Sequence, residues 1–137
     1  MTVNNTAFWM GMDKFFTYNG TVNTLPCSLR RWVFENINQT QLFQVTCGSN
    51  EGFNEVWWYY VSASSKGTIV DKYVIYNYLD QVWYYGTLNR SAWYQTGILQ
   101  FPIAADYNSR LLYHENGNDD VSTATPQPIK AYLQSSD

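Results

Sequence analysis

The chain has 137 residues, of which 45% are hydrophobic, 18% are aromatic and only 14% are charged, and its net charge is −3. This length suits one domain over residues 1–137. The acidic balance argues against specific nucleic-acid binding, because contacts to phosphates need clustered Lys and Arg, and the pair Arg30–Arg31 fits a solvated helix face. No apolar run approaches the ~18 residues of a membrane-spanning helix, so no membrane contact is expected.

The aromatic content is unusually high. Twelve Tyr and six Trp residues exceed what one core of this size can bury. Such side chains suit interfaces, because each combines a large apolar body with a polar group. We therefore expect part of the aromatic set to form an assembly surface. The alternative is that these residues only fill broad β-sheet faces.

The N-terminal segment predicts a three-stranded antiparallel meander. Three apolar runs, Ala7–Gly11, Lys14–Tyr18 and Val22–Leu25, follow one another, and Asn19–Gly20 separates the last two. Asn-Gly between apolar runs is a strong hairpin signal, since both residues tolerate positive φ. After this unit, Ser28 is predicted to cap a short helix over Leu29–Asn36, with an irregular connector as the alternative.

The middle segment carries the clearest strand pattern. Three runs of strand-forming residues, Glu55–Val61, Asp71–Tyr78 and Val82–Gly86, are separated by polar turns. They predict three consecutive antiparallel strands. Because both alternating faces of these runs are apolar, we expect the sheet to be packed on both sides.

The C-terminal segment repeats the pattern more weakly. A strand over Pro102–Ala105 is followed by a turn over Asp106–Ser109, a strand over Arg110–His114 and a final strand over Ile129–Leu133. Equivalent runs recur along the chain at Lys14–Gly20, Lys72–Tyr78 and Arg110–Gly117.

Three blade-like units follow from this repetition, over residues 7–27, 54–93 and 101–134. The expected fold class is therefore all-β, with antiparallel meander sheets resembling about three β-propeller blades and one short helix. A closed propeller needs roughly four to eight blades. The propeller would thus be partial, or completed by further chains in an oligomer or larger assembly.

The residues of the middle unit resemble a known family. Asn54–Tyr60, Asp71–Tyr78 and Trp83–Trp93 are similar to the blade motif of virion structural proteins from tailed bacteriophages, and Phe8–Gly20 and Ala131–Asp137 also fit that family. The resemblance implies a β-propeller region of a tail tube, nozzle or hub component. It further implies packing against other tail or virion proteins, and localisation in the virion tail after assembly in the host cytoplasm. Family members run on past Ser135–Asp137, so we expect a truncated chain.

The sequence offers no credible active site. His114 is the single histidine, which leaves no histidine-based metal cluster. No scaffold visibly fixes Glu51 and Glu55 as paired carboxylates, and residues 116–120 lack the distal Glu of a calcium loop. We expect no enzyme activity, no metal and no cofactor. Cys27 and Cys47 are expected to be reduced and partly buried, although a disulfide between them stays open.

The residues with predicted roles are aromatic, with one arginine. Trp83 and Trp93 are expected to act as packing anchors and Arg90 as an interface contact, since Trp, Tyr and Arg dominate interface energetics. The full set for packing and interfaces is Trp57, Trp58, Trp83, Tyr85, Arg90 and Trp93. The alternative function is a carbohydrate- or receptor-binding β module of a phage adsorption protein. Its site would combine Trp57, Trp58, Trp83, Tyr84, Tyr85 and Trp93 with Asn77 and Asp80.

Overall fold

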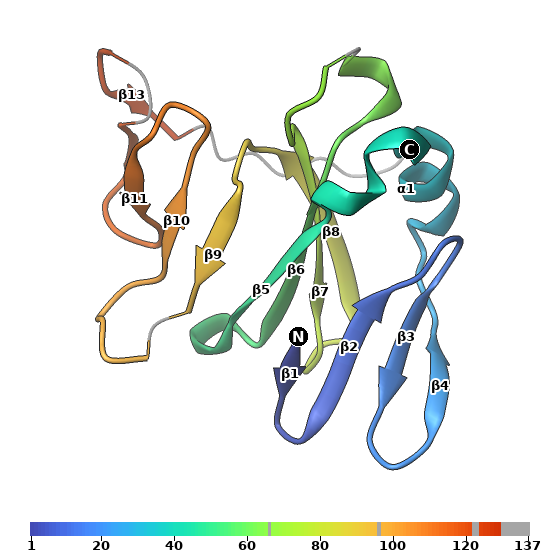
Figure 1. Ribbon diagram of the computed structural model, residues 1–137. Helices are drawn as coiled ribbons and strands as arrows, with labels where there is room; N and C mark the ends of the chain where they lie inside the picture. Colours follow the sequence, from blue (N-terminus) through green and yellow to red (C-terminus); the bar gives the residue numbers. More distant parts are fainter. Residues whose placement is uncertain (66, 96, 122–123, 130–137) are drawn as a thin grey trace, which may run out of the picture.

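The computed structural model describes residues 1–65, 67–95, 97–121 and 124–129 (Figure 1). The described part of the chain is mostly β, with four antiparallel sheets in the strand orders β1-β2-β3-β4, β5-β6-β7-β8, β11-β10-β9 and β12-β13. One α-helix and three short 3₁₀ helices lie in the connections between the described strands. The all-β class is confirmed.

The first sheet contains the predicted N-terminal meander and one strand more. Its strands are β1 (Thr2–Val3), β2 (Thr6–Met10), β3 (Phe15–Tyr18) and β4 (Val22–Leu25). The two-residue strand β1 was not predicted from the sequence. Asn4 and Asn5 both take positive φ, at 48° and 58°, and so form the tight turn that folds β1 back onto β2.

The predicted helix is present as α1 (Arg30–Asn36). The predicted cap at Ser28 is wrong: the helix begins after Leu29, and no side chain caps it. Fully buried Val33 anchors the helix in the same apolar cluster as Phe8 and Phe15 of the first sheet. The segment after α1 continues into the 3₁₀ helix η1 (Gln39–Gln44), where the Asn38 side chain accepts a hydrogen bond from the Thr40 backbone N–H at 3.1 Å.

The second sheet contains the three predicted central strands and a fourth that the sequence did not indicate. Its strands are β5 (Thr46–Asn50), β6 (Glu55–Tyr60), β7 (Lys72–Asn77) and β8 (Val82–Thr87). Strand β5 runs to Asn50, and the 3₁₀ helix η2 (Glu51–Phe53) follows it directly. Another 3₁₀ helix, η3 (Ala63–Ser65), lies between β6 and β7.

Both faces of the second sheet are packed, as predicted. Trp58 and Tyr60 of β6 belong to the cluster that includes the first sheet, while Trp57 and Tyr59 belong to a second cluster with Trp93. Strand β6 therefore alternates its side chains between two separate cores. Figure 1 shows the resulting arrangement, in which the second sheet lies between the first and the third.

The third sheet is made of β9 (Ala92–Tyr94), β10 (Ile103–Ala105) and β11 (Leu111–Tyr113). Ala92 and Trp93 were expected to end the middle unit, but they pair with β10 and so begin the third sheet. The hairpin of β12 (Asp119–Asp120) and β13 (Gln127–Pro128) was not predicted. The predicted final strand over Ile129–Leu133 falls, apart from Ile129, outside the described residues.

Candidate assembly surface and aromatic stack

Two tryptophans join the second sheet to the third. The Trp93 ring stacks on the Trp57 ring at a centroid distance of 5.4 Å, and its Nε1–H donates a hydrogen bond to the Ser49 carbonyl oxygen at 2.8 Å. Gly48 lies against the Trp93 indole so closely that a side chain at this position would overlap the ring. Trp57 and Trp93 thus act as anchors between two sheets of one chain.

The aromatic residues on the other face of the second sheet connect it to the first. Phe15, which is fully buried, lies 4.9 Å from the Trp58 ring and 4.7 Å from the Trp83 ring. The Trp83 Nε1–H donates to the Pro26 carbonyl oxygen at 2.9 Å. Trp58 and Trp83 are therefore internal packing residues in the structure.

Tyr85 differs from the tryptophans because 54% of it is exposed. Its ring lies 4.1 Å from the Trp32 ring of α1, and the Lys72 Nζ lies 5.0 Å from the centre of that indole. A cation over an aromatic face is attracted by the ring quadrupole. Tyr85 thus lies at the edge of a small surface cluster with α1.

Arg90 lies inside the molecule. It is 5% exposed, its Nε–H donates to His114 Nε2 at 2.9 Å, and its Nη1–H donates to the Asn89 carbonyl oxygen at 2.8 Å. Burial and the neighbouring Arg90 charge lower the pKa of His114 to about 4, which keeps the imidazole neutral and able to accept this bond. Because Arg90 is buried and its guanidinium is hydrogen-bonded to residues of its own chain, it does not belong to the assembly surface.

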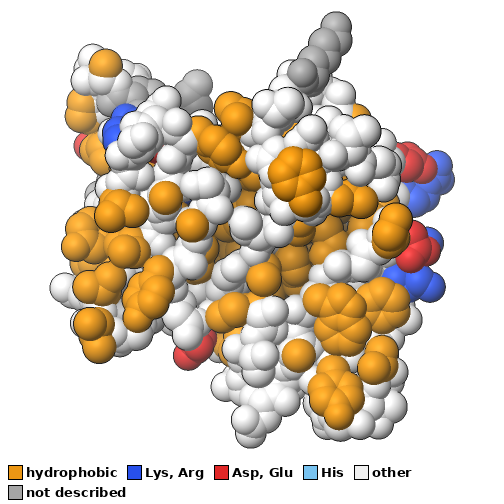
Figure 2. Space-filling view, viewed as in Figure 1, with side chains coloured by type: hydrophobic (Ala, Val, Ile, Leu, Met, Phe, Trp, Pro, Cys, Tyr) orange, Lys and Arg blue, Asp and Glu red, His pale blue; other side chains and the backbone are white. Residues whose placement is uncertain are grey.

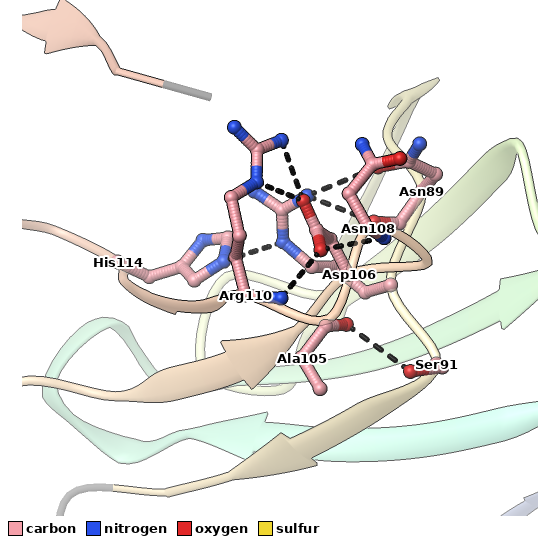
Figure 3. Close-up of polar contacts among 8 residues, drawn as sticks. Asn89, Ser91, Ala105, Asp106, Asn108, Arg110 and His114 are labelled. Atoms are coloured by element: carbon pink, nitrogen blue, oxygen red, sulfur yellow. Dashed lines mark hydrogen bonds and ion pairs between the residues drawn. The ribbon is translucent and has the colours of Figure 1, made fainter. Parts of the chain in front are cut away.

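The turn beside this pair is fixed by Asp106, whose side chain is 1% exposed. Its Oδ1 accepts hydrogen bonds from the backbone N–H groups of Asn108 and Arg110, and its Oδ2 pairs with the Arg110 guanidinium (Figure 3). Burial tends to raise the pKa of Asp106, but these hydrogen bonds and the Arg110 charge outweigh it and lower the pKa. The predicted turn at 106–109 is confirmed, and Ser109 takes a positive φ of 61° within it.

The residues of the carbohydrate-binding alternative do not share one surface. Trp57 and Trp58 are buried on opposite faces of β6. Asn77 is also buried, and its Oδ1 accepts hydrogen bonds from the N–H groups of Leu79 and Asp80. Of the eight residues, the exposed ones are Tyr84, Tyr85 and Asp80.

A pocket of about 600 Å³ lies near the end of the third sheet and the β12–β13 hairpin. Its lining includes Arg90, His114 and Glu115, and the described lining residues include no Ser, Thr, Cys or Lys. Within the described ranges, no three His, Cys, Asp or Glu side chains are grouped as a metal site. Glu55 was considered as a catalytic carboxylate; it is half-buried, which raises its pKa, and it accepts the Trp57 indole N–H at 2.9 Å.

The two cysteines are unpaired, with Cys27 partly buried and Cys47 exposed. Burial raises the pKa of the Cys27 thiol to about 11. The expectation of partial burial is therefore confirmed for Cys27 and wrong for Cys47. Among the described helices, none is both long and apolar enough to cross a membrane.

The face of the first sheet that points away from the second sheet is apolar and is not covered by another described sheet. Trp9 and Phe16 stack there at a centroid distance of 5.3 Å, while Tyr18 and Val22 are 49% and 59% exposed. Strand pairing assigns to this face, here named the β1–β4 free face, the residues Thr2, Ala7, Trp9, Phe16, Tyr18, Val22 and Thr24.

The third sheet has a comparable face on the opposite side of the stack. Tyr94, Leu111 and Tyr113 are 52%, 74% and 60% exposed there. This β9–β11 free face consists of Ala92, Tyr94, Ile103, Ala105, Leu111 and Tyr113. Figure 2 shows hydrophobic side chains gathered over both the first and the third sheet. Neither free face contains a charged residue, which is typical of the centre of a protein interface.

None of the residues on these free faces was predicted from the sequence to be an interface residue. Their alternation within each strand was visible, but only the pairing between strands and the stacking of sheets show which alternate residues are covered. Comparison with known protein families finds no family model that matches the chain, and comparison with curated proteins finds no match. The resemblance to phage tail proteins therefore rests on the sequence motifs alone.

Proposed function

We propose that this chain is a structural component of a bacteriophage tail, in which it forms part of a rigid β-propeller-like wall. The single observation that carries the proposal is the pair of uncharged, aromatic free faces at the two ends of a stack of sheets. A monomer that exposes such faces to water at both ends gains stability when another subunit covers them. The resemblance of the sequence motifs to those of tail proteins supports the choice of the tail as the assembly.

The stacked sheets support the blade interpretation. Propeller blades are four-stranded antiparallel meanders that pack face to face. The strand orders β1-β2-β3-β4 and β5-β6-β7-β8 have this topology, and the third sheet has three such strands in the described residues. In this proposal the buried tryptophans make the wall stiff, while the free faces join it to neighbouring tail proteins.

Immunogold electron microscopy of virions whose genome encodes this sequence tests the proposal. Antibodies against the purified chain are expected to label the tail. Mass spectrometry of the same purified virions is expected to detect its peptides. Absence of the peptides from intact virions, or gold particles confined to the capsid, contradicts a role in the tail.

A further inference from the structure

We infer that a second copy of this chain covers the free faces, with the β1–β4 free face of each copy packed on the β9–β11 free face of the other. The inference rests on the assembly role proposed above and names the partner. It follows from which face of each sheet packs on the next sheet along the chain and which packs on the preceding one. The strand pairing identifies these faces.

Strands β3, β7 and β11 occupy equivalent places in their sheets. Each contributes one residue to a pair whose two backbones do not bond to each other: Phe15 pairs with Met10, Tyr73 with Tyr59, and Leu111 with Ala105. In the first and third sheets the adjacent pair is the bonded one, with Gly11 N–H donating to the Lys14 carbonyl and Asp106 N–H donating to the Arg110 carbonyl. In the second sheet Leu88 N–H donates to the Asp71 carbonyl, so Tyr73, two residues on, directs its backbone groups to β8 and not to β6. Phe15, Tyr73 and Leu111 are therefore equivalent positions, and the residues that follow them, Phe16, Val74 and Leu112, are equivalent on the opposite face.

The first set of positions points toward the next sheet. Phe15 contacts Trp58 of the second sheet, and the Tyr73 ring lies 5.0 Å from the Trp57 ring, which stacks on Trp93 of the third sheet. Leu111, the equivalent residue of the third sheet, lies on the β9–β11 free face. We name this side of each sheet its forward face.

The second set of positions points toward the preceding sheet. Val74 lies in the cluster shared with the first sheet, and Leu112 lies on the same side as Trp93, which packs on the second sheet. Phe16, the equivalent residue of the first sheet, lies on the β1–β4 free face. This side of each sheet is its rear face.

A forward face meets a rear face at both junctions within the chain. One rear face, on the first sheet, and one forward face, on the third, are left without a partner sheet among the described residues. A second copy supplies the missing member of each pair, so association is head to tail. Two copies with three stacked sheets each make six sheets, within the roughly four to eight of closed propellers.

Sedimentation equilibrium of the purified chain tests the inference. The wild type is expected to have twice the monomer mass of 15.9 kDa. Tyr18→Arg on one free face and Tyr113→Arg on the other are each expected to weaken self-association by roughly tenfold or more, because each places a charge in both junctions. Phe43→Arg is the matched control: Phe43 is 80% exposed in η1, off both faces, and its variant is expected to dimerise as the wild type does.

Mixing the two variants distinguishes head-to-tail contact from contact between like faces. In a pair of one Tyr18→Arg and one Tyr113→Arg chain, one junction carries both charges and the other is wild type. The mixture, with one variant mass-labelled, is therefore expected to regain heterodimers in native mass spectrometry. If Tyr18→Arg fails to show a cooperative unfolding transition, Val22→Arg on the same face replaces it.

Several results overturn the inference. A wild-type chain that remains monomeric at its highest soluble concentration would rule out a second copy as the partner. The proposed function would still be supported in that case if antibodies label the virion tail. Dimers that are insensitive to either substitution place the contact elsewhere. Growth into open chains of increasing mass contradicts closure at two copies.

Discussion

The Trp57 and Trp93 indoles stack with centroids 5.4 Å apart and an interplanar angle of 17°, although they belong to different sheets. Trp57 is buried within β6, whereas Trp93 comes from β9, the first strand of the third sheet. This stack, together with the hydrogen bond from Trp93 to Ser49, joins the third sheet to the rest of the chain. Four predictions test the packing that the structure describes.

Replacing Trp93 by Ala should strongly destabilise the fold. The change removes the stack on Trp57 and leaves a cavity beside Gly48, so the free energy of unfolding is expected to fall by about 3 kcal/mol, the size typical of Trp truncation in a core. Urea unfolding followed by far-ultraviolet circular dichroism measures it. Phe43→Ala, which truncates an 80% exposed side chain off both free faces, serves as control and should cost less than about 1 kcal/mol. Equal losses in both variants would contradict the packing described.

Replacing Gly48 by Ala should destabilise the protein because a methyl group there overlaps the Trp93 ring. We expect a loss of about 1–3 kcal/mol in urea unfolding, as for other overpacked cores. Gly52→Ala is the matched control, since the nearest atom to a side chain there is the Asn50 Oδ1 at 3.9 Å.

A double-mutant cycle distinguishes the overlap with the Trp93 ring from a general sensitivity of β5 to substitution. In the Trp93→Ala background, Gly48→Ala should cost much less than in the wild type, because the methyl group then enters the vacated space. A cost that is the same in both backgrounds would show that the ring is not the obstacle.

Replacing Tyr59 by Phe should leave stability unchanged or raise it slightly. The Tyr59 side chain is fully buried, and its hydroxyl has no hydrogen-bond partner among the described residues. Removing an unpaired buried hydroxyl removes a desolvation cost. Tyr107→Phe is the matched comparison, because the Tyr107 hydroxyl donates to Gln44 Oε1 at 3.1 Å and accepts from the Val70 N–H at 3.3 Å; it should lose about 1 kcal/mol in thermal or urea unfolding. The reverse order of the two variants would overturn this description.

The free energy of unfolding should decrease as the pH is lowered from 6.5 to 4, because of His114. Its pKa is about 4 in the folded chain, lowered by burial and by Arg90, against 6.5 ordinarily. In this window the unfolded chain binds the extra proton and the folded chain does not, so acid favours unfolding. Below the folded pKa this contribution is fully lost.

His114→Gln isolates this effect, since the Gln side-chain oxygen can still accept the Arg90 Nε–H. The variant is expected to show a flatter profile of unfolding free energy from pH 6.5 to pH 4. At still lower pH, the wild type and the His114→Gln variant should both lose stability. The reason is that the Asp106 carboxylate, whose pKa is lowered in the folded chain, then becomes protonated. Parallel profiles across the His114 window would contradict the assignment.

The sequence allowed those strands to be predicted whose signals are local. The Asn19–Gly20 turn located the hairpin between β3 and β4. The long aromatic run of β6, apolar on both alternating faces, correctly indicated a sheet packed on both sides. Local propensity and periodicity were sufficient in these places.

The remaining strands depend on contacts that are distant in sequence. Strand β5 consists of Thr, Cys, Gly, Ser and Asn, which have weak strand propensity except for Thr, and Gly48 is there because Trp93 leaves no room for a side chain. Trp93 is the last residue of the middle unit in sequence, and only its pairing with Ala104 assigns it to the third sheet. The free faces could not be located for the same reason, since they are defined by what the neighbouring sheets leave uncovered.

The repeated order of forward and rear faces has a consequence for how such chains evolve. A further meander inserted between two sheets would present its rear face to the sheet before it and its forward face to the sheet after it. Both contacts are of a kind that the chain already makes, so tandem duplication of one unit lengthens the array without requiring a new type of interface. Chain length then becomes a quantity that evolution can change one sheet at a time.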